Sequence, residues 1–293
     1  MTPASLKDNV TANEGKQIMS EAPTYVLGHS DLEIERLQLQ ASLIDGITSR
    51  LIRECGIAPG MNVLDIGCGA GDVSMLVADA VGPAGKVVAF DRESRVIETA
   101  RIRAQKRGYR NIEFVVTSDE EWPKHAAFDA AIGRYILPHQ ADPVAMVRRA
   151  AASVRPGGVV ASHEIAFGYQ HQFQTLPTVK VYDKISQSLG AVFEATLPQP
   201  LVGNYLAVCF EDAGLPSPRL IWECVVGDHK SGMARWAALT YRSMLPHIQR
   251  LGLEVGGEDD LDTLTERLQA ALAAVRAQVV SRPQTCVWAI RPL

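Results

Sequence analysis

The first half of the chain alternates between two spacings of apolar residues. Short runs rich in Val, Ile and Phe predict buried strands, and stretches with apolar residues three or four positions apart predict helices between them. The strands are predicted at about 63–66, 87–90, 112–116, 128–132 and 159–163. The helices are predicted at about 73–80, 94–107 and 143–154. This alternation indicates an α/β fold.

The pattern differs on either side of this region. A helix is predicted from about residue 30 to Cys55, after a polar and weakly patterned beginning. From Ile165 to about residue 200 the chain is mixed and rich in aromatic residues, and no element is assigned there. Helices at 201–213, 231–251 and 261–280 and strands at 220–226 and 286–291 complete the prediction. A chain of 293 residues with these elements is expected to form one α/β core with an added cap.

Glycines follow the first strand at every second residue, at Gly67, Gly69 and Gly71. Because glycine has no Cβ, such a turn can adopt positive φ and let the backbone approach a ligand at the end of the sheet. The second strand ends at Asp91, 24 residues beyond Gly67, where an acid can accept both hydroxyls of a ribose. The alternative is an ordinary strand-to-helix turn, with Asp91 as the N-cap of the next helix.

The glycine spacing indicates which nucleoside the turn would bind. Dinucleotide sites have the pattern G-x-G-x-x-G, and the helix that follows faces a pyrophosphate. This chain has G-x-G-x-G followed at once by Asp72. An acid at that position would repel a phosphate and suits a ligand that carries an amine or a sulfonium.

Four segments of the chain resemble the successive motifs of class I S-adenosylmethionine-dependent methyltransferases. They read VLDIGCGAGD, VVAFD, FDAAIGRYILPHQADP and RPGGVV. The similarity covers about residues 25–165 and is to the branch of the ubiquinone- and menaquinone-biosynthesis methyltransferases. It implies a doubly wound, seven-stranded, mostly parallel Rossmann-like sheet whose last strand is antiparallel. The implied cofactor is S-adenosyl-L-methionine, and the implied reaction is methyl transfer to an O, N or C atom of a small, flat, largely apolar acceptor.

The resemblance also implies a division of the chain into three parts. Residues 1–57 would be a tail and a helical lid over the cofactor, and 58–230 with 281–293 would be the methyltransferase core. Residues 231–280 exceed a minimal core and would form a helical cap over the acceptor. The alternative role of these inserted helices is dimerisation, so a homodimer is a possible assembly.

The cofactor-binding residues implied by the resemblance come from five places along the chain. They are Tyr25 and Gln40, the loop residues Asp65, Gly67, Cys68 and Gly69, then Asp91 and Arg92, Ser118 and Asp119, and Gly133 and Arg134. Asp65 is expected to accept N–H groups of the loop and to offset the cofactor's positive charge, and Cys68 to be a small filler. Many relatives have Gly-Asp where this chain has Thr117-Ser118, so Ser118 or Asp119 is expected to take over the adenine contact.

Methyl transfer from a sulfonium is an in-line displacement, which needs no metal, and none is expected. Holding the reactants collinear can supply ~7–11 kcal/mol. A general base is needed only where the acceptor must lose a proton. The candidates, which follow the fourth and fifth strands at one end of the sheet, are His139, His163, Glu164 and Tyr169. The alternative for each histidine is a purely structural role.

Composition limits the other possibilities. The formal charge is −4, from 29 basic and 33 acidic residues without a long basic run, which disfavours nucleic acid as a partner. Five cysteines without a C-x-x-C pair disfavour a disulfide framework and a zinc site. No signal sequence or long apolar run is present, so a cytoplasmic protein with no membrane contact is expected. Two alternatives stay open: a protein that binds S-adenosylmethionine without transferring its methyl group, and a nicotinamide-dependent oxidoreductase.

Overall fold

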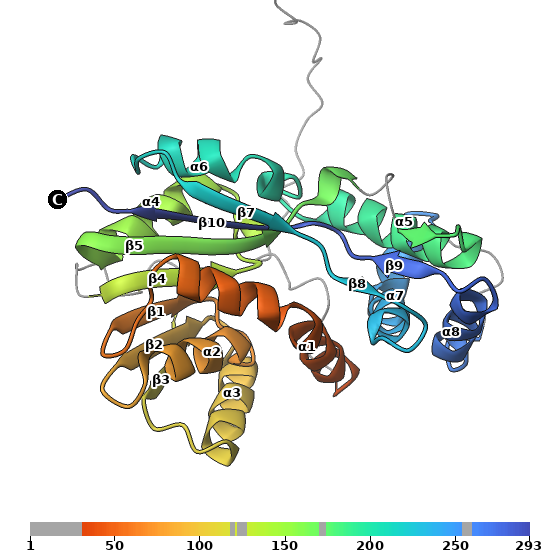
Figure 1. Ribbon diagram of the computed structural model, residues 1–293, viewed down its shortest axis with the longest axis horizontal. Coiled ribbons are helices and arrows are strands. Elements are labelled where there is room, and N and C mark those ends of the chain that lie inside the picture. The colour runs from red at the N-terminus through yellow and green to blue at the C-terminus, as the bar shows by residue number, and fades with distance from the viewer. Residues whose placement is uncertain (1–30, 118–120, 122–127, 170–173, 254–259) are drawn as a thin grey trace, which may run out of the picture.

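The central feature of the molecule is a seven-stranded sheet with the order β3-β2-β1-β4-β5-β10-β7 (Figure 1). The computed structural model describes residues 31–117, 121, 128–169, 174–253 and 260–293. β10 runs antiparallel to both of its neighbours, and the other strand pairs are parallel. The strands are β1 (Asn62–Ile66), β2 (Lys86–Asp91), β3 (Ile112–Val116), β4 (Phe128–Arg134), β5 (Val154–Ile165), β7 (Arg219–Glu223) and β10 (Gln284–Ile290). The predicted fold class is confirmed, including the antiparallel last strand.

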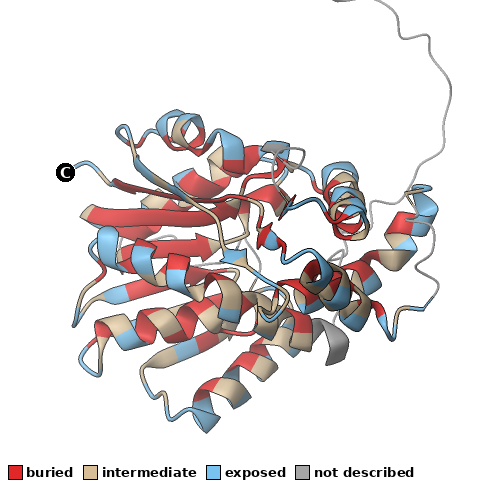
Figure 2. Ribbon diagram, turned by 45° about the vertical axis from the view of Figure 1, so that its right-hand side comes forward, coloured by how far each residue is buried: buried red, intermediate tan, exposed pale blue. Residues whose placement is uncertain are grey.

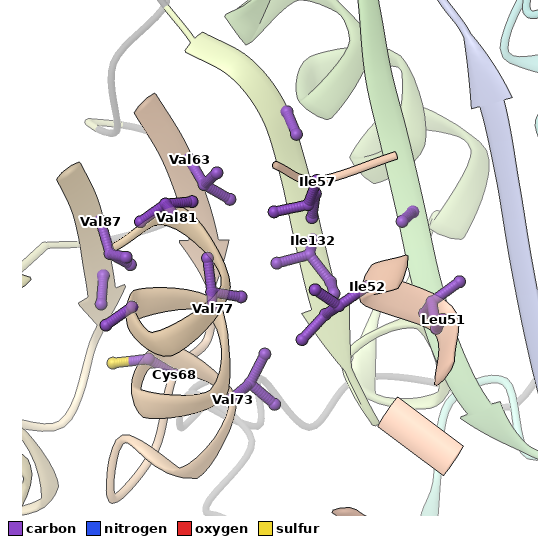
Figure 3. Close-up of a cluster of buried hydrophobic side chains, with 14 of the residues drawn as sticks. Leu51, Ile52, Ile57, Val63, Cys68, Val73, Val77, Val81, Val87 and Ile132 are labelled. Atoms are coloured by element: carbon purple, nitrogen blue, oxygen red, sulfur yellow. The ribbon is translucent and has the colours of Figure 1, made fainter. Parts of the chain in front are cut away.

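Helices cover both faces of this sheet because successive side chains of a strand point to opposite faces. Val63 belongs to the core under α1 (Asp31–Glu54), α2 (Asp72–Val81) and α3 (Ser94–Lys106). Its neighbour Leu64 belongs to the core under α4 (Pro143–Ser153) and α6 (Leu206–Asp212). Figure 3 shows the first core, in which Val63, Val87 and Ile132 of the strands face α2 and α1. Figure 2 shows the same layering as buried strands between helices with exposed outer sides.

A second layer of helices lies beyond the end of the sheet, at the right of Figure 1. It consists of α5 (Lys180–Thr196), α7 (Met233–Arg250) and α8 (Leu264–Ala274), which share one apolar core. A small sheet of order β6-β9-β8 accompanies them, formed by β6 (Thr175–Leu176), β9 (Gln278–Val280) and β8 (Val226–Gly227). We call these helices and this sheet the cap.

In the cap, one prediction is wrong and one helix was missed. The helix expected over 261–280 ends at Ala274, because Arg276 adopts a left-handed φ of 52° and the chain then enters β9. α5 was not predicted, although its buried Tyr182, Ile185 and Leu189 are spaced three and four apart, as on one face of a helix. The division of the chain into a core and an inserted cap at 231–280 stays a prediction. α5, which lies before residue 231, packs in the same apolar core as α7.

Candidate active site

A cavity of about 680 Å³ opens at the carboxyl ends of β1, β2 and β4 and continues under the cap. One end is polar and is built by the loops that follow these strands. The other end is apolar and is built by α5 and α7. Of the predicted site residues, those on the cavity wall are Gln40, Asp65, Gly67, Cys68, Gly69, Asp91, Arg92, Arg134 and His139.

The glycine turn has the backbone conformation that its sequence predicts. Gly67, Gly69 and Gly71 have φ of 61°, 51° and 84°. A Cβ on Gly67 would collide with the side chain of Ile136, whereas one on Gly69 would meet no atom within 4 Å. The turn therefore leaves open space above Gly69, and Cys68 packs into the core under α2 (Figure 3).

Asp91 connects the glycine turn to the end of β2. Its Oδ2 accepts the Gly69 N–H at 3.0 Å and its Oδ1 accepts the Glu93 N–H at 3.0 Å. The side chain is half-buried, and burial raises the pKa of this carboxyl above its usual value. Each oxygen has one further lone pair, so the carboxylate can hold the turn and still accept hydroxyl groups from a ligand in the cavity.

Asp65 is the buried acid of the site, with 1% of its surface exposed. Its Oδ2 accepts the Ser74 hydroxyl at 2.6 Å, and its Oδ1 is buried without a hydrogen-bond partner among the described residues. Burial raises its pKa to about 7. The expectation that Asp65 accepts N–H groups of the loop is wrong, because Asp91 does so instead. Asp65 is thus left with one acceptor atom for a donor that enters the cavity.

Asp72 is paired with an arginine. The argument from the sequence had treated Asp72 as an unpaired negative charge. The Arg103 guanidinium of α3 binds it through both nitrogens, with Nη2–Oδ1 2.5 Å and Nη1–Oδ2 3.2 Å. The same Nη1 donates to the Ala70 carbonyl at 2.6 Å. The negative charge of Asp72 is therefore largely balanced, and its power to repel a phosphate is weaker than predicted. The two residues are 31 apart in sequence, so no local pattern reveals the pair.

The end of β4 is fixed to α1 and to β10. Arg134 Nη1 donates to Asp45 Oδ1 at 2.9 Å and to Thr48 Oγ1 at 3.0 Å. The Tyr135 hydroxyl donates to Gln284 Oε1 at 2.5 Å, and both Arg134 and Tyr135 line the cavity. Gly133, a predicted cofactor contact, pairs with Ile66 of β1, is buried, and is not among the residues that line the cavity.

Gln40 reaches the cavity from α1, where Arg36 Nη1 donates to its Oε1 at 2.8 Å. Gln40 and the glycine turn thus line the same cavity, and the role of the N-terminal helix as a lid stays a prediction. Three cofactor candidates, Tyr25, Ser118 and Asp119, lie outside the described residues.

His163 and Glu164 do not reach the cavity, which contradicts their predicted position at the tip of β5. β5 continues to Ile165, and β10 pairs with it opposite both residues. His163 is fully buried, with Nδ1 3.0 Å from Thr48 Oγ1 and Nε2 3.2 Å from Gln284 Oε1. Burial lowers its pKa to about 3, so it is a neutral structural residue.

Glu164 holds the turn that follows β4. Its Oε1 accepts the Ser162 hydroxyl at 2.6 Å and the N–H groups of Ile136 and Leu137, each at 3.3 Å. Burial raises its pKa to about 7. Glu164 therefore positions the segment that leads to His139 and does not contact a ligand in the cavity.

His139 is the general-base candidate that lines the cavity among the described side chains. It ends the short 3-10 helix Leu137–His139, and burial together with the Arg92 charge lowers its pKa to about 4. The imidazole is thus neutral at pH 7 and has a nitrogen lone pair for a proton. Tyr169 ends a second short helix, Phe167–Tyr169, and its side chain lies outside the described part of the chain.

The cap supplies the apolar end of the cavity. Its wall contains Tyr182, Leu189 and Phe193 of α5, Met233 and Trp236 of α7, and Arg282 before β10. The aromatic stretch after Ile165 predicted part of this wall. Trp236 was missed although its helix was predicted, because the sequence does not show which face of α7 lines the cavity. Arg282 was missed because the strand β9 that precedes it was not predicted.

The described ranges were searched for membrane-spanning helices and for clusters of metal-binding side chains. No helix there combines the length and the apolar composition needed to cross a bilayer. In the same ranges, His, Cys, Asp and Glu side chains do not form a group of three that could hold a metal ion.

The chain is similar to known methyltransferases. A family model described as a methyltransferase domain matches residues 57–198. The demethylmenaquinone methyltransferase of Lactococcus lactis is 26% identical over 157 residues, covering 52% of this chain and 60% of that protein. The ubiquinone biosynthesis O-methyltransferase of Methylocella silvestris is 40% identical over 103 residues, covering 34% of this chain and 38% of that protein. The resemblance drawn from the four sequence segments is confirmed.

A solved structure shows the same fold. Phosphoethanolamine N-methyltransferase 2 of Haemonchus contortus, in complex with S-adenosyl-L-methionine, aligns with a TM-score of 0.52 at 16% identity. The alignment covers 85% of this chain and 53% of that chain. This chain spans less than two thirds of the length of the two relatives above.

Proposed function

We propose that this chain, whose residues 57–198 match the methyltransferase-domain family model, binds S-adenosyl-L-methionine and transfers its methyl group to a small acceptor. The cofactor would occupy the polar end of the cavity and the acceptor its apolar end. The observation that carries the proposal is the unpartnered Oδ1 of Asp65 beside the open glycine turn. A buried acceptor atom without a partner is costly unless a donor arrives with a ligand.

The residues present fit this cofactor. Asp91 has lone pairs for the two ribose hydroxyls, and Asp65 has an acceptor atom for the amine. Gly69 has open space where a side chain would lie, which lets the backbone approach the ligand. Arg92 and Gln40 lie on the same wall and complete the proposed site.

When bound, the cofactor supplies a methyl group on a positively charged sulfur. The contribution of the chain is to position the acceptor, and the cavity walls exclude water from it. Holding the reacting atoms in line at contact distance can supply ~7–11 kcal/mol. Neutral His139 can take a proton from an acceptor hydroxyl, although its low pKa makes it a weak base.

The acceptor we propose is a flat, largely apolar small molecule. The walls formed by Tyr182, Phe193 and Trp236 support this, since aromatic side chains stack on flat ring systems. The names of the two relatives, which concern quinone biosynthesis, point the same way. The formal charge of −4 disfavours a nucleic-acid substrate.

The test has two stages. Isothermal titration with S-adenosylhomocysteine is expected to show one site per chain, and NAD⁺ at the same concentration is expected to show none. The protein is then incubated with S-adenosylmethionine and a panel of hydroquinones, catechols and naphthols, and mass spectrometry detects S-adenosylhomocysteine with a product heavier by one methylene. Binding without turnover across the panel would favour a role for the cofactor other than methyl transfer, and NAD⁺ binding would favour an oxidoreductase.

A further inference from the structure

Arg282 lines the cavity beside the cap and has one hydrogen-bond donor, Nε, without a partner among the described residues. Its Nη2 donates to the Ser186 carbonyl, and its guanidinium lies over the Phe167 ring, with 5.8 Å from Cζ to the ring centroid. Its Nε is buried without a hydrogen-bond partner in the described part of the chain. Arg282 therefore differs from Arg134, another arginine that lines the cavity, whose Nη1 is paired with Asp45 Oδ1 at 2.9 Å.

Among the described residues, no acid is hydrogen-bonded to Arg282. Burial lowers the pKa of Arg282 to about 10, and the charges of Tyr182 and Glu194 act in the opposite direction. The group is thus still a cation at neutral pH. A guanidinium taken out of water without an anion beside it is unfavourable, and an anionic ligand would relieve that cost.

The distance between Arg282 and the end of β4 indicates how long a ligand that reaches both would be. Gln284 of β10 pairs with Ile165 of β5, so Arg282 and Phe167 lie together just beyond this pair, at the same edge of the sheet as the glycine turn. In the sheet, β10 is two strands from β4. At an interstrand spacing of ~4.8 Å, this separates Arg282 from the end of β4 by roughly 10 Å.

We propose that Arg282 binds an anionic group, such as a carboxylate, at the far end of the acceptor. The acceptor is then an elongated aromatic acid whose apolar body lies between Tyr182, Phe193 and Trp236. The anion accepts a hydrogen bond from the Nε–H of Arg282 and anchors the molecule, while the other end of the molecule lies toward β4. The assignment of this ligand as the acceptor rests on the proposed function, but the anion site itself does not.

Two matched fluorescent probes test the site without any turnover. The first is 8-anilinonaphthalene-1-sulfonate, and the second is N-phenyl-1-naphthylamine, which has the same ring systems without the sulfonate. The intact protein is titrated with each probe, and so is Arg282→Gln. Because hydrogen bonds to charged groups are lost, the variant is expected to bind the sulfonate roughly tenfold or more weakly. Binding of the uncharged probe is expected to change less than twofold.

Control variants separate the site from general effects of charge and folding. Arg110→Gln removes an exposed arginine and is expected to leave both probes unaffected. Arg282→Lys retains the charge and is expected to recover most of the sulfonate affinity. An equal loss of both probes in Arg282→Gln, or an equal loss of sulfonate binding in Arg110→Gln, would overturn the proposal.

Competition on the unmodified protein covers the case in which Arg282→Gln fails to fold. 2-Naphthoate is expected to displace N-phenyl-1-naphthylamine at roughly tenfold lower concentration than 2-naphthamide, because only the acid carries the charge. Equal potency of the two competitors would contradict an anion site. Titration with S-adenosylhomocysteine in parallel reports on the cofactor end alone, so its failure would count against the proposed function and not against this site.

Discussion

We expect the buried carboxyl of Asp65 to make the affinity for S-adenosylhomocysteine depend on pH. The pKa of Asp65 is raised from 3.8 to about 7 by burial, and Ser74 is its sole hydrogen-bond donor among the described residues. A ligand amine at Oδ1 needs the ionised carboxylate, so the proton must leave before the ligand can bind. Affinity for S-adenosylhomocysteine is therefore expected to fall about tenfold per pH unit below 7 and to level off above it.

The same shift has a consequence for folding, and its sign follows from which state holds the proton. Between pH 4 and 7 the folded chain keeps the Asp65 proton and the unfolded chain has lost it. The free energy of unfolding is thus highest below pH 4 and decreases as the pH rises to 7, by about 4 kcal/mol from this one group. Asp65→Asn removes this part of the pH dependence because the amide does not titrate.

Calorimetry at pH 5.5, 6.5, 7.5 and 8.5 measures the effect on affinity. In two buffers of different ionisation enthalpy, the wild-type protein is expected to release close to one proton per ligand at pH 5.5. Ser74→Ala removes the hydroxyl that stabilises the ionised form, so the break in its profile is expected above pH 7. An affinity that is independent of pH in the wild type, or a profile of the same slope in Asp65→Asn, would refute the assignment of Asp65.

Four further changes test other parts of the site. Asp91→Ala is expected to weaken S-adenosylhomocysteine binding by more than tenfold, because charge-assisted hydrogen bonds worth about 1.5–3 kcal/mol each are lost; an unchanged dissociation constant would place the ribose elsewhere. Gly67→Val is expected to abolish binding while circular dichroism shows a folded protein, since Gly67 has φ of 61° and faces Ile136; normal titration would show the turn to be unimportant. In the wild type, the raised pKa of Glu164 is expected to lower the free energy of unfolding by about 3 kcal/mol as the pH rises from 4.5 to 7. Glu164→Gln is expected to abolish this decrease, as measured by urea denaturation; an unchanged pH dependence in the variant would count against the raised pKa of Glu164. His139→Gln is expected to lower kcat for a hydroxyl acceptor by about 100-fold with little change in KM; an unaltered kcat would exclude a proton transfer to His139.

The sheet could be predicted because its information is local. Val63 and Leu64 are both apolar yet belong to cores on opposite faces, which is the pattern of a strand covered on both sides. The glycine turn could be predicted as well, since positive φ at Gly67 and Gly69 is a property of the residue type.

The contacts that decide charge and burial could not be predicted in this way. Arg103 neutralises Asp72 from a different helix, and β10 buries His163 from the far end of the chain. Whether a polar residue faces the cavity depends on where its strand ends, and β5 continues beyond His163 to Ile165. Such effects arise from the packing of distant segments, which no window of sequence contains.

A crystal structure of the chain grown with S-adenosylhomocysteine is the most direct test of the central claim. We expect the ribose hydroxyls to lie within hydrogen-bond distance of Asp91 and the amine to lie at Oδ1 of Asp65. An empty cavity at saturating ligand, or a ligand bound away from the glycine turn, would contradict it.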